Sequence, residues 1–374
     1  MDSYVARPEA LAELIAAVRR APRIAVDTEA ASFHRYRDRI YLIQISTTDR
    51  TALIDPLALT DLSLVGAVLA DPGIEKTFHD ADYDLRVLDR DYGFRATRLF
   101  DTRIAAQLAG EPAIGLAALL EKYAGVKLAK EHQKADWSQR PLPPPMLAYA
   151  AEDTRHLLAL RDALEQLLRE LGRFEWAREE FTRLEGLRWT GVAEGDTDGY
   201  LRVKGAKGLP ARALAVFREL HRWRETVAQR DDKAPFRVIG NDSLLAISKA
   251  MPQAVEDLAK LKDVPASLAR RHGAALLEAV SRARALPESD LPRLERSARP
   301  PKDPEFDGRV ERLKALRNRV AAELKIDAGV LCGRTTLEAV ARARPNNRAG
   351  LAQVAELRRW QGDVLGDAML EALR

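Results

Sequence analysis

The sequence is poor in cysteine and has no long hydrophobic run. Its single cysteine, Cys332, cannot form an internal disulfide or a zinc site built from several thiolates. No apolar run approaches the length of about 18 residues that a membrane-spanning helix needs. The N-terminal segment MDSYVARPEA lacks the basic and apolar parts of a secretory signal. We therefore expect a cytoplasmic protein with no membrane partner, and no obligate protein partner is visible.

The charge is distributed unevenly along the 374 residues, a length that favours two or three domains. Residues 1–200 carry a net charge of −7, whereas residues 201–374 carry +11. An acidic half joined to a basic half is compatible with a protein that handles a polyanion such as nucleic acid. Solvated helix faces rich in Arg and Glu would give a similar asymmetry.

The first half alternates segments typical of strands with segments typical of helices. Strands are predicted at 23–29, 39–47 and 51–56, and a short strand at the start of 76–93 leads into a helix that ends at Gly93. Further helices are predicted at 61–72, 101–109 and 115–123, followed by one long helix from Met146 to Leu171. This alternation predicts a mixed sheet flanked by helices, which ends near residue 190.

Beyond about residue 205 the strand signal disappears and two helical blocks follow, separated by a linker rich in proline and charge. The segment VIGNDSLLAISKAMP (238–252) matches VLCGRTTLEAVARARP (330–345) with one residue inserted. This internal repeat of roughly 90 residues predicts two related small helical domains.

Four acidic residues are candidates for a metal site. Asp27 and Glu29 are two positions apart on a predicted strand, so their side chains share one face. Asp84 begins a helix directly after a strand, and Asp153 follows Tyr149 by four residues on one helix face. Exposed strand-end acids and helix caps are the alternative interpretation of these residues.

Carboxylates that converge in one place repel each other, so they need cations nearby. Ligands that offer only oxygen favour Mg²⁺ or Mn²⁺. Two divalent ions about 4 Å apart are the known arrangement for in-line attack on a phosphodiester. We therefore expect two divalent ions as cofactors.

Three motifs in this order resemble a known family. D-T-E at 27–29, H-x4-D at His79 and Asp84, and Y-x3-D at Tyr149 and Asp153 resemble the exonuclease motifs of the DEDD superfamily, in its tyrosine-containing subgroup. The segments LIQIS, LFDTRIAAQLAG (99–110) and DWSQRPL (136–142) are similar to the ribonuclease D family. The two C-terminal blocks resemble the helicase-and-RNase-D C-terminal (HRDC) domain.

The resemblance implies an α/β exonuclease domain with a ribonuclease H-like mixed sheet, followed by two small all-α HRDC-like domains. The implied ranges are 1–190 for the exonuclease domain, 205–285 for the first HRDC domain, 286–304 for a linker and 305–374 for the second.

The resemblance also implies roles for single residues. Asp27, Glu29, Asp84 and Asp153 would bind the metal ions, and the Tyr149 hydroxyl would hold the attacking water. Asp80 and Asp82 compete with Asp84, and only the H-x4-D spacing selects the last. His79 contacts the substrate, orders the turn before Asp84, or simply packs at a strand end.

The activity implied is that of a 3′→5′ exoribonuclease that releases nucleoside 5′-monophosphates and trims tRNA precursors with 3′ extensions. Lys204 and Lys207, in the basic segment RVKGAKGLPAR (202–212), are expected to contact the RNA backbone. Two alternatives stay open: a DNA-directed exonuclease of the Werner type, and a non-catalytic RNA-binding protein on the same fold. The first would lack a helicase part, because no G-x4-G-K-[ST] motif is present.

Overall fold

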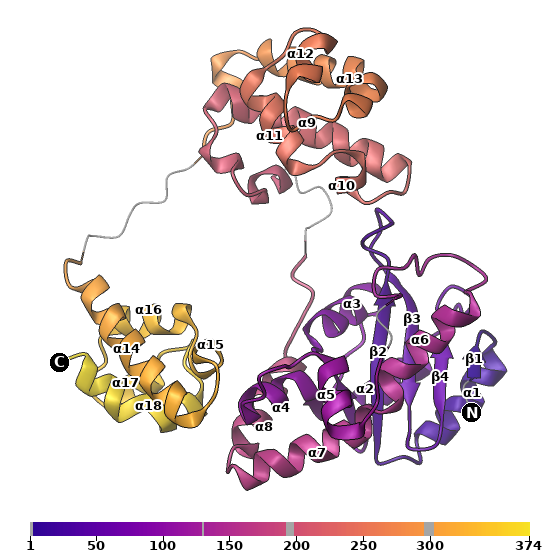
Figure 1. Ribbon diagram of the computed structural model, residues 1–374, viewed down its shortest axis with the longest axis vertical. Coiled ribbons are helices and arrows are strands. Elements are labelled where there is room, and N and C mark those ends of the chain that lie inside the picture. The colour runs from indigo at the N-terminus through magenta and orange to yellow at the C-terminus, as the bar shows by residue number, and fades with distance from the viewer. Residues whose placement is uncertain (1–2, 129–130, 192–197, 295–302) are drawn as a thin grey trace. The chain divides into compact units, whose positions relative to one another are not determined.

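The computed structural model describes residues 3–128, 131–191, 198–294 and 303–374. The chain forms two compact units (Figure 1). One unit contains Met1–Ala30, Ile40–Trp189 and Pro301–Arg374; the other contains Ala31–Arg39 and Thr190–Pro300. The domain ranges that the resemblance implies remain predictions.

A six-stranded mixed sheet forms the centre of the N-terminal domain, which we define as the elements from β1 to α8. Its strands are β1 (Ser3–Val5), β2 (Arg23–Ala30), β3 (Ile40–Ser46), β4 (Thr51–Ile54), β5 (Glu75–Phe78) and β6 (Leu99–Asp101), in the order β1-β4-β3-β2-β5-β6. Strand β2 pairs antiparallel with β3 and parallel with β5. All seven residues of β3 are buried, as expected for a central strand covered on both faces. The predicted mixed sheet is confirmed.

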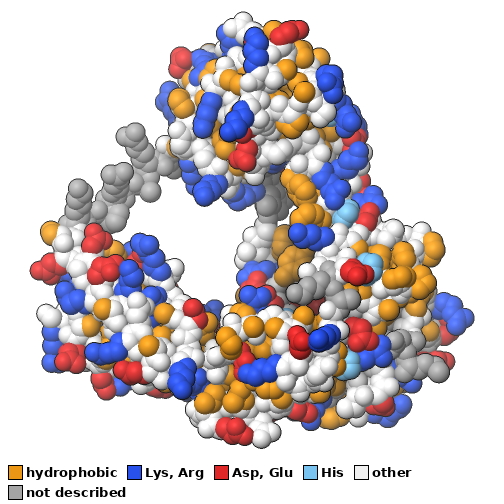
Figure 2. Space-filling model, in the orientation of Figure 1, with side chains coloured by type: hydrophobic (Ala, Val, Ile, Leu, Met, Phe, Trp, Pro, Cys, Tyr) orange, Lys and Arg blue, Asp and Glu red, His pale blue; other side chains and the backbone are white. Residues whose placement is uncertain are grey.

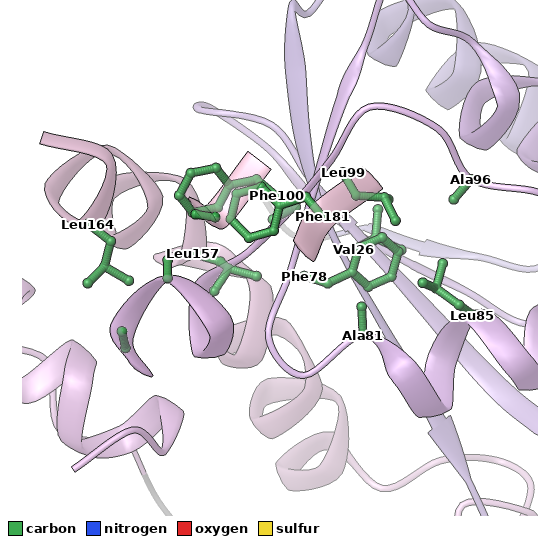
Figure 3. Close-up of a cluster of buried hydrophobic side chains, with 14 of the residues drawn as sticks. Val26, Phe78, Ala81, Leu85, Ala96, Leu99, Phe100, Leu157, Leu164 and Phe181 are labelled. Atoms are coloured by element: carbon green, nitrogen blue, oxygen red, sulfur yellow. The ribbon is translucent and has the colours of Figure 1, made fainter. Parts of the chain in front are cut away.

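Helices flank this sheet (Figure 1). They are α1 (Pro8–Val18), α2 (Ser63–Ala70), α3 (Asp82–Tyr92), α4 (Thr102–Ala109), α5 (Leu116–Ala124), α6 (Pro144–Arg155), α7 (Leu157–Glu170) and α8 (Phe174–Glu185). Figure 3 shows part of the core, where Val26 of β2 and Phe78 of β5 lie close to Leu85 of α3. The rings of Phe100 and Phe181 join β6 to α8, with their centroids 4.7 Å apart.

The prediction of one long helix from Met146 to Leu171 was wrong, because the segment forms two helices. The chain leaves the helical conformation at His156, whose φ and ψ are −104° and 0°. Helix α6 packs against β2, β3 and β4, whereas α7 packs mainly against α4 and α5 and also contacts β2 and β5. No glycine or proline marks the break, so only the two different packing surfaces account for it.

Two helical repeats follow. The first helical repeat contains α9 (Ala211–Arg230), α10 (Pro235–Val238), α11 (Asn241–Ala250), α12 (Val255–Lys260) and α13 (Ala266–Arg284). The second helical repeat contains α14 (Phe306–Leu324), α15 (Ala328–Leu331), α16 (Arg334–Ala343), α17 (Arg348–Ala352) and α18 (Arg359–Ala372). Short 3-10 turns lie at Gly199–Arg202, Ala206–Gly208 and Glu288–Asp290.

The two repeats share one register. Helices α15 to α18 each begin 93 residues after α10 to α13, as the starts at 235, 241, 255 and 266 against 328, 334, 348 and 359 show. Gly240 therefore corresponds to Gly333, and Ile239 corresponds to Cys332. The predicted insertion of one residue was wrong. It aligned Val238 with Val330 because both are valine, whereas the register of the helices aligns Val238 with Leu331.

The second helical repeat packs against α4 and α8 within the same compact unit. The Glu179 carboxylate accepts the backbone N–H groups of Arg359 and Trp360, at 2.7 and 3.0 Å, and so caps the N-terminus of α18. The Trp360 ring stacks on Trp176 with centroids 5.0 Å apart. Trp360 is buried.

Gly110 makes a close approach possible between α4 and the second helical repeat. Its φ is +85°, and a Cβ atom there would lie 2.3 Å from the carbonyl oxygen of Lys325. Only glycine fits both the left-handed conformation and this contact.

No helix within the described ranges is both long and apolar enough to cross a membrane.

Candidate active site

Two acids of β2 lie on one face of the sheet. Asp27 and Glu29 alternate with Val26 and Thr28, and Val26 points into the core (Figure 3). Strand β2 pairs with β3 through Glu29, and the register shifts between Glu29 and Ala30. The two carboxylates therefore lie at the end of the regular strand, where a side chain can reach a ligand.

Helix α6 brings a third acid to this place. Ligand atoms of Asp27, Glu29 and Asp153 all lie within 4.8 Å of one another. Tyr149 lies one turn before Asp153, and its hydroxyl hydrogen-bonds to the Asp153 carboxylate. Asp27, Glu29, Tyr149 and Asp153 come from a strand and a helix far apart in the sequence, and they lie together in the fold.

Asp84 lies beside this group and not within it. The Thr28 hydroxyl donates a hydrogen bond to Asp84 Oδ1. Its two competitors point elsewhere, because Asp80 pairs with Arg103 at 2.7 Å and Asp82 pairs with Arg86 at 2.6 Å. Of the three acids, only Asp84 is buried.

The pKa values of the four carboxylates are those of buried acids without a positive charge beside them. Burial and the Asp153 charge raise the pKa of Asp27 to about 8, and burial raises the pKa of Asp153 to about 7. Burial and the Asp27 charge raise the pKa of both Glu29 and Asp84 well above the usual range. Among the residues that the structure describes, no Lys or Arg forms an ion pair with any of the four carboxylates.

The position of α6 is fixed by buried polar contacts next to Asp153. The Thr154 and Ser46 hydroxyls lie 2.7 Å apart, and Ser46 also lies 2.8 Å from the Thr51 hydroxyl. Before the helix, Arg140 makes two hydrogen bonds of 2.8 Å to the Asp55 carboxylate. These contacts hold α6 at one register against the sheet.

A cleft of about 370 Å³ opens at the acids. Asp27, Tyr149 and Asp153 line it, together with His79. The lining also includes mostly apolar residues that the sequence analysis missed: Gly115, Leu116, Ala117, Ala118, Leu128 and Gln133. They carry no chemical signature, so no motif could have identified them.

His79 lines the cleft but is also held in place. Its Nδ1 lies 2.9 Å from the Thr102 hydroxyl. Burial lowers the pKa of His79 to about 4, with a smaller contribution from the Arg103 charge, so the ring is neutral near pH 7. The geometry is compatible both with a substrate contact and with a packing role.

Asp101 is a further residue that the sequence analysis missed. Its carboxylate caps α4 by accepting the N–H groups of Arg103 and Ile104 at 2.8 and 3.0 Å. It also accepts the N–H of Ala81 at 2.7 Å, just before the helix that carries Asp84. The signal that could have found it is an aspartate at the start of a predicted helix.

Lys204 and Lys207 are exposed and belong to the other compact unit. Their predicted role in RNA binding stays a prediction.

Comparisons with known proteins agree with this site and fold. Residues 3–169 match the 3′-5′ exonuclease family, and residues 213–280 and 306–373 each match the HRDC domain. Ribonuclease D of Granulibacter bethesdensis is 32% identical over 374 residues, which cover 98% of this chain and 91% of that protein. Ribonuclease D of Escherichia coli K12 is 32% identical over 371 residues, covering 98% and 96%.

A solved structure extends the comparison to three dimensions. The crystal structure of Escherichia coli RNase D, described as an exoribonuclease involved in structured RNA processing, matches with a TM-score of 0.73 and 31% identity. The match covers 99% of this chain and 98% of that one. Fold and domain order thus define the class, which is that of the 3′→5′ exonucleases. Within that class the chain belongs to the ribonuclease D family, and it is a hydrolase that acts on the phosphodiester bonds of RNA.

Proposed function

We propose that this exoribonuclease works with divalent metal ions, Mg²⁺ or Mn²⁺, held by Asp27, Glu29, Asp153 and Asp84. The observation that supports this proposal most is the group of ligand atoms within 4.8 Å. Carboxylate oxygen is the donor that these ions prefer. The reaction releases nucleoside 5′-monophosphates from the 3′ end.

The donor set fits such ions for a second reason. The raised pKa values of Asp27 and Asp153 reflect buried negative charge with no compensating cation nearby. A buried carboxylate without a partner is costly, and metal binding removes that cost. Bound at this site, divalent ions supply positive charge to the phosphate and to the leaving oxygen, and make a water molecule more acidic.

Tyr149 positions the attacking water and does not act as a base. Burial and the charges of Asp153 and Glu29 raise the pKa of its phenol further above 10, so the hydroxyl stays protonated at neutral pH. Its hydrogen bond to Asp153 fixes the direction of the hydroxyl. The apolar residues around Leu116 line the same cleft as the acids and suit the terminal ribose and base.

The substrate we propose is structured RNA, specifically tRNA precursors with 3′ extensions, processed in the cytoplasm. Two observations support it: the RNA-processing role of the Escherichia coli relative and the net charge of +11 in residues 201–374. Lys204 and Lys207 are exposed and are proposed to contact the RNA backbone.

The test uses a tRNA labelled at its 5′ end and extended at its 3′ end. With Mg²⁺, the protein should shorten it stepwise and release nucleoside 5′-monophosphates, and EDTA should stop the reaction. Asp27→Ala should abolish cleavage, whereas Asp82→Ala, an exposed acid that pairs with Arg86, should retain it. Undiminished cleavage by Asp27→Ala would reject the metal site.

Two further outcomes address the alternatives. Equal degradation of single-stranded DNA would favour the DNA-directed enzyme. RNA binding without any shortening, in the presence of Mg²⁺ or Mn²⁺, would favour the non-catalytic protein.

A further inference from the structure

The same face of the two helical repeats has different surroundings. In the second helical repeat, Gly333, Thr336 and Trp360 line a pocket of about 490 Å³ together with Leu108 of α4 and Glu180 of α8. The counterparts in the first helical repeat, found by subtracting 93, are Gly240, Ser243 and Ser267. These three line a groove of about 350 Å³ whose lining residues all belong to the compact unit of the first repeat.

The charge of this face also differs between the repeats. The groove of the first helical repeat contains Lys233, Arg237 and Arg271. The matching positions of the second helical repeat are apolar and are occupied by Ile326, Val330 and Val364. Apolar residues at these three positions suit packing against a domain, whereas cations suit a ligand that carries negative charge.

The cations of the groove are available to a ligand. Lys233 and Arg271 are exposed, and neither forms an ion pair with any residue in the described parts of the chain. Arg237 is exposed as well, and its Nε donates to the carbonyl of Phe33 at 2.5 Å. The acid in the groove, Asp231, pairs with Arg230 at 2.7 Å.

The groove also offers an aromatic surface. Phe236 lines it and is 50% exposed, and its ring and that of Phe33 form an edge-to-face pair with centroids 5.3 Å apart. Exposed aromatic rings next to Lys and Arg are the surfaces on which unpaired bases stack. Figure 2 shows Lys and Arg side chains over the surface of the domain that contains the first helical repeat.

We propose that this groove binds the phosphate backbone of single-stranded RNA through Lys233 and Arg271, with Phe236 stacking on a base. The second helical repeat uses the same face to pack against α4 and α8, so RNA binding on this face is confined to the first repeat. The nature of the ligand rests on the proposed exoribonuclease function.

The test measures binding of a fluorescein-labelled single-stranded RNA to the full-length protein by anisotropy, in EDTA and over a range of KCl concentrations. The double variant Lys233→Ala/Arg271→Ala should bind about tenfold more weakly. Each phosphate contact to single-stranded nucleic acid contributes about 0.7 to the salt slope, so the slope should fall by about 1.4. The matched control Lys262→Ala/Arg270→Ala removes two exposed cations of the same repeat that do not line the groove.

The inference is supported if the control variant binds RNA within about twofold of wild type while the groove variant binds it more weakly. Equal weakening of binding in both variants would overturn it, because the overall positive charge would then account for binding. Unchanged binding of the groove variant would also overturn it. The charge reversal Lys233→Glu/Arg271→Glu should weaken binding further than the alanine variant. Because binding is measured without divalent ions, it is separate from RNA shortening in Mg²⁺, which alone tests the proposed function.

Discussion

Replacing Asp27 with Asn should stabilise the protein in the absence of metal while abolishing its activity. Burial and the Asp153 charge raise the pKa of Asp27 to about 8, so the folded protein holds this proton more tightly than the unfolded chain. The stabilisation from the neutral carboxyl is complete below the unfolded pKa near 4, and it is lost as the pH rises towards 8. Asn stays neutral at every pH and avoids this loss.

The magnitude follows from the same pKa. A rise from 3.8 to about 8 corresponds to about 6 kcal/mol at pH 8, at about 1.4 kcal/mol per pH unit, if every other acid kept its charge. Because Glu29 and Asp153 take up protons too, we expect Asp27→Asn to recover about 2 kcal/mol. That corresponds to a midpoint of thermal unfolding about 4–8 °C higher at pH 8, and to a smaller difference at pH 5.

The assay is far-ultraviolet circular dichroism in EDTA at both pH values. Asp82→Asn is the control, because Asp82 is exposed and its pair with Arg86 contributes little. Added Mg²⁺ should raise the midpoint of the wild type more than that of Asp27→Asn. A midpoint of Asp27→Asn at pH 8 equal to or below that of the wild type would mean that a positive group already neutralises Asp27, and the reasoning would be wrong.

Three further predictions concern residues around the site and the second helical repeat. Tyr149→Phe should lower kcat by about 10²-fold without changing the stabilisation by Mg²⁺, because only the water is misplaced; a wild-type kcat would contradict this. Thr154→Val removes the buried contact with Ser46 and should cost about 1–2 kcal/mol, measured by thermal unfolding. Glu180→Ala removes the acceptor of the Trp360 indole N–H, so tryptophan fluorescence should report a similar loss; an unchanged midpoint would show that this contact does not hold the repeat.

Local geometry explains what the sequence could predict about the site. Asp27 and Glu29 share a face because strands alternate, and Tyr149 and Asp153 share one because they are a helical turn apart. The structure brings Asp27, Glu29 and Asp153 together. Their roles as metal ligands stay a prediction that the experiments above address.

Contacts between distant segments explain what the sequence could not predict. Asp101 holds the turn before α3 through a backbone N–H that lies 20 residues away. The break at His156 accompanies a change of main packing partners, from the sheet strands for α6 to α4 and α5 for α7. The apolar residues of the cleft, such as Leu116, have the composition of any helix start, and nothing in them marks a site.

The second helical repeat illustrates the same limit. Sequence similarity predicted that it is a copy of the first repeat. Aligning the two segments on identical residues, however, introduced an insertion that the structure does not contain. Its packing against α8 depends on Glu179 and Trp360, which the sequence separates by about 180 residues. The pairing of an acid with a helix N-terminus is common in sequences, so it could not be recognised in advance.

The stacking of Trp176 on Trp360 has a consequence for synthesis of the chain. At about 5–20 residues per second, a ribosome needs about 10–40 s to travel from the first tryptophan to the second. During that interval α8 is complete, but the indole that will cover it does not yet exist. A nascent or prematurely terminated chain therefore presents this aromatic surface to chaperones, proteases and other unfinished copies.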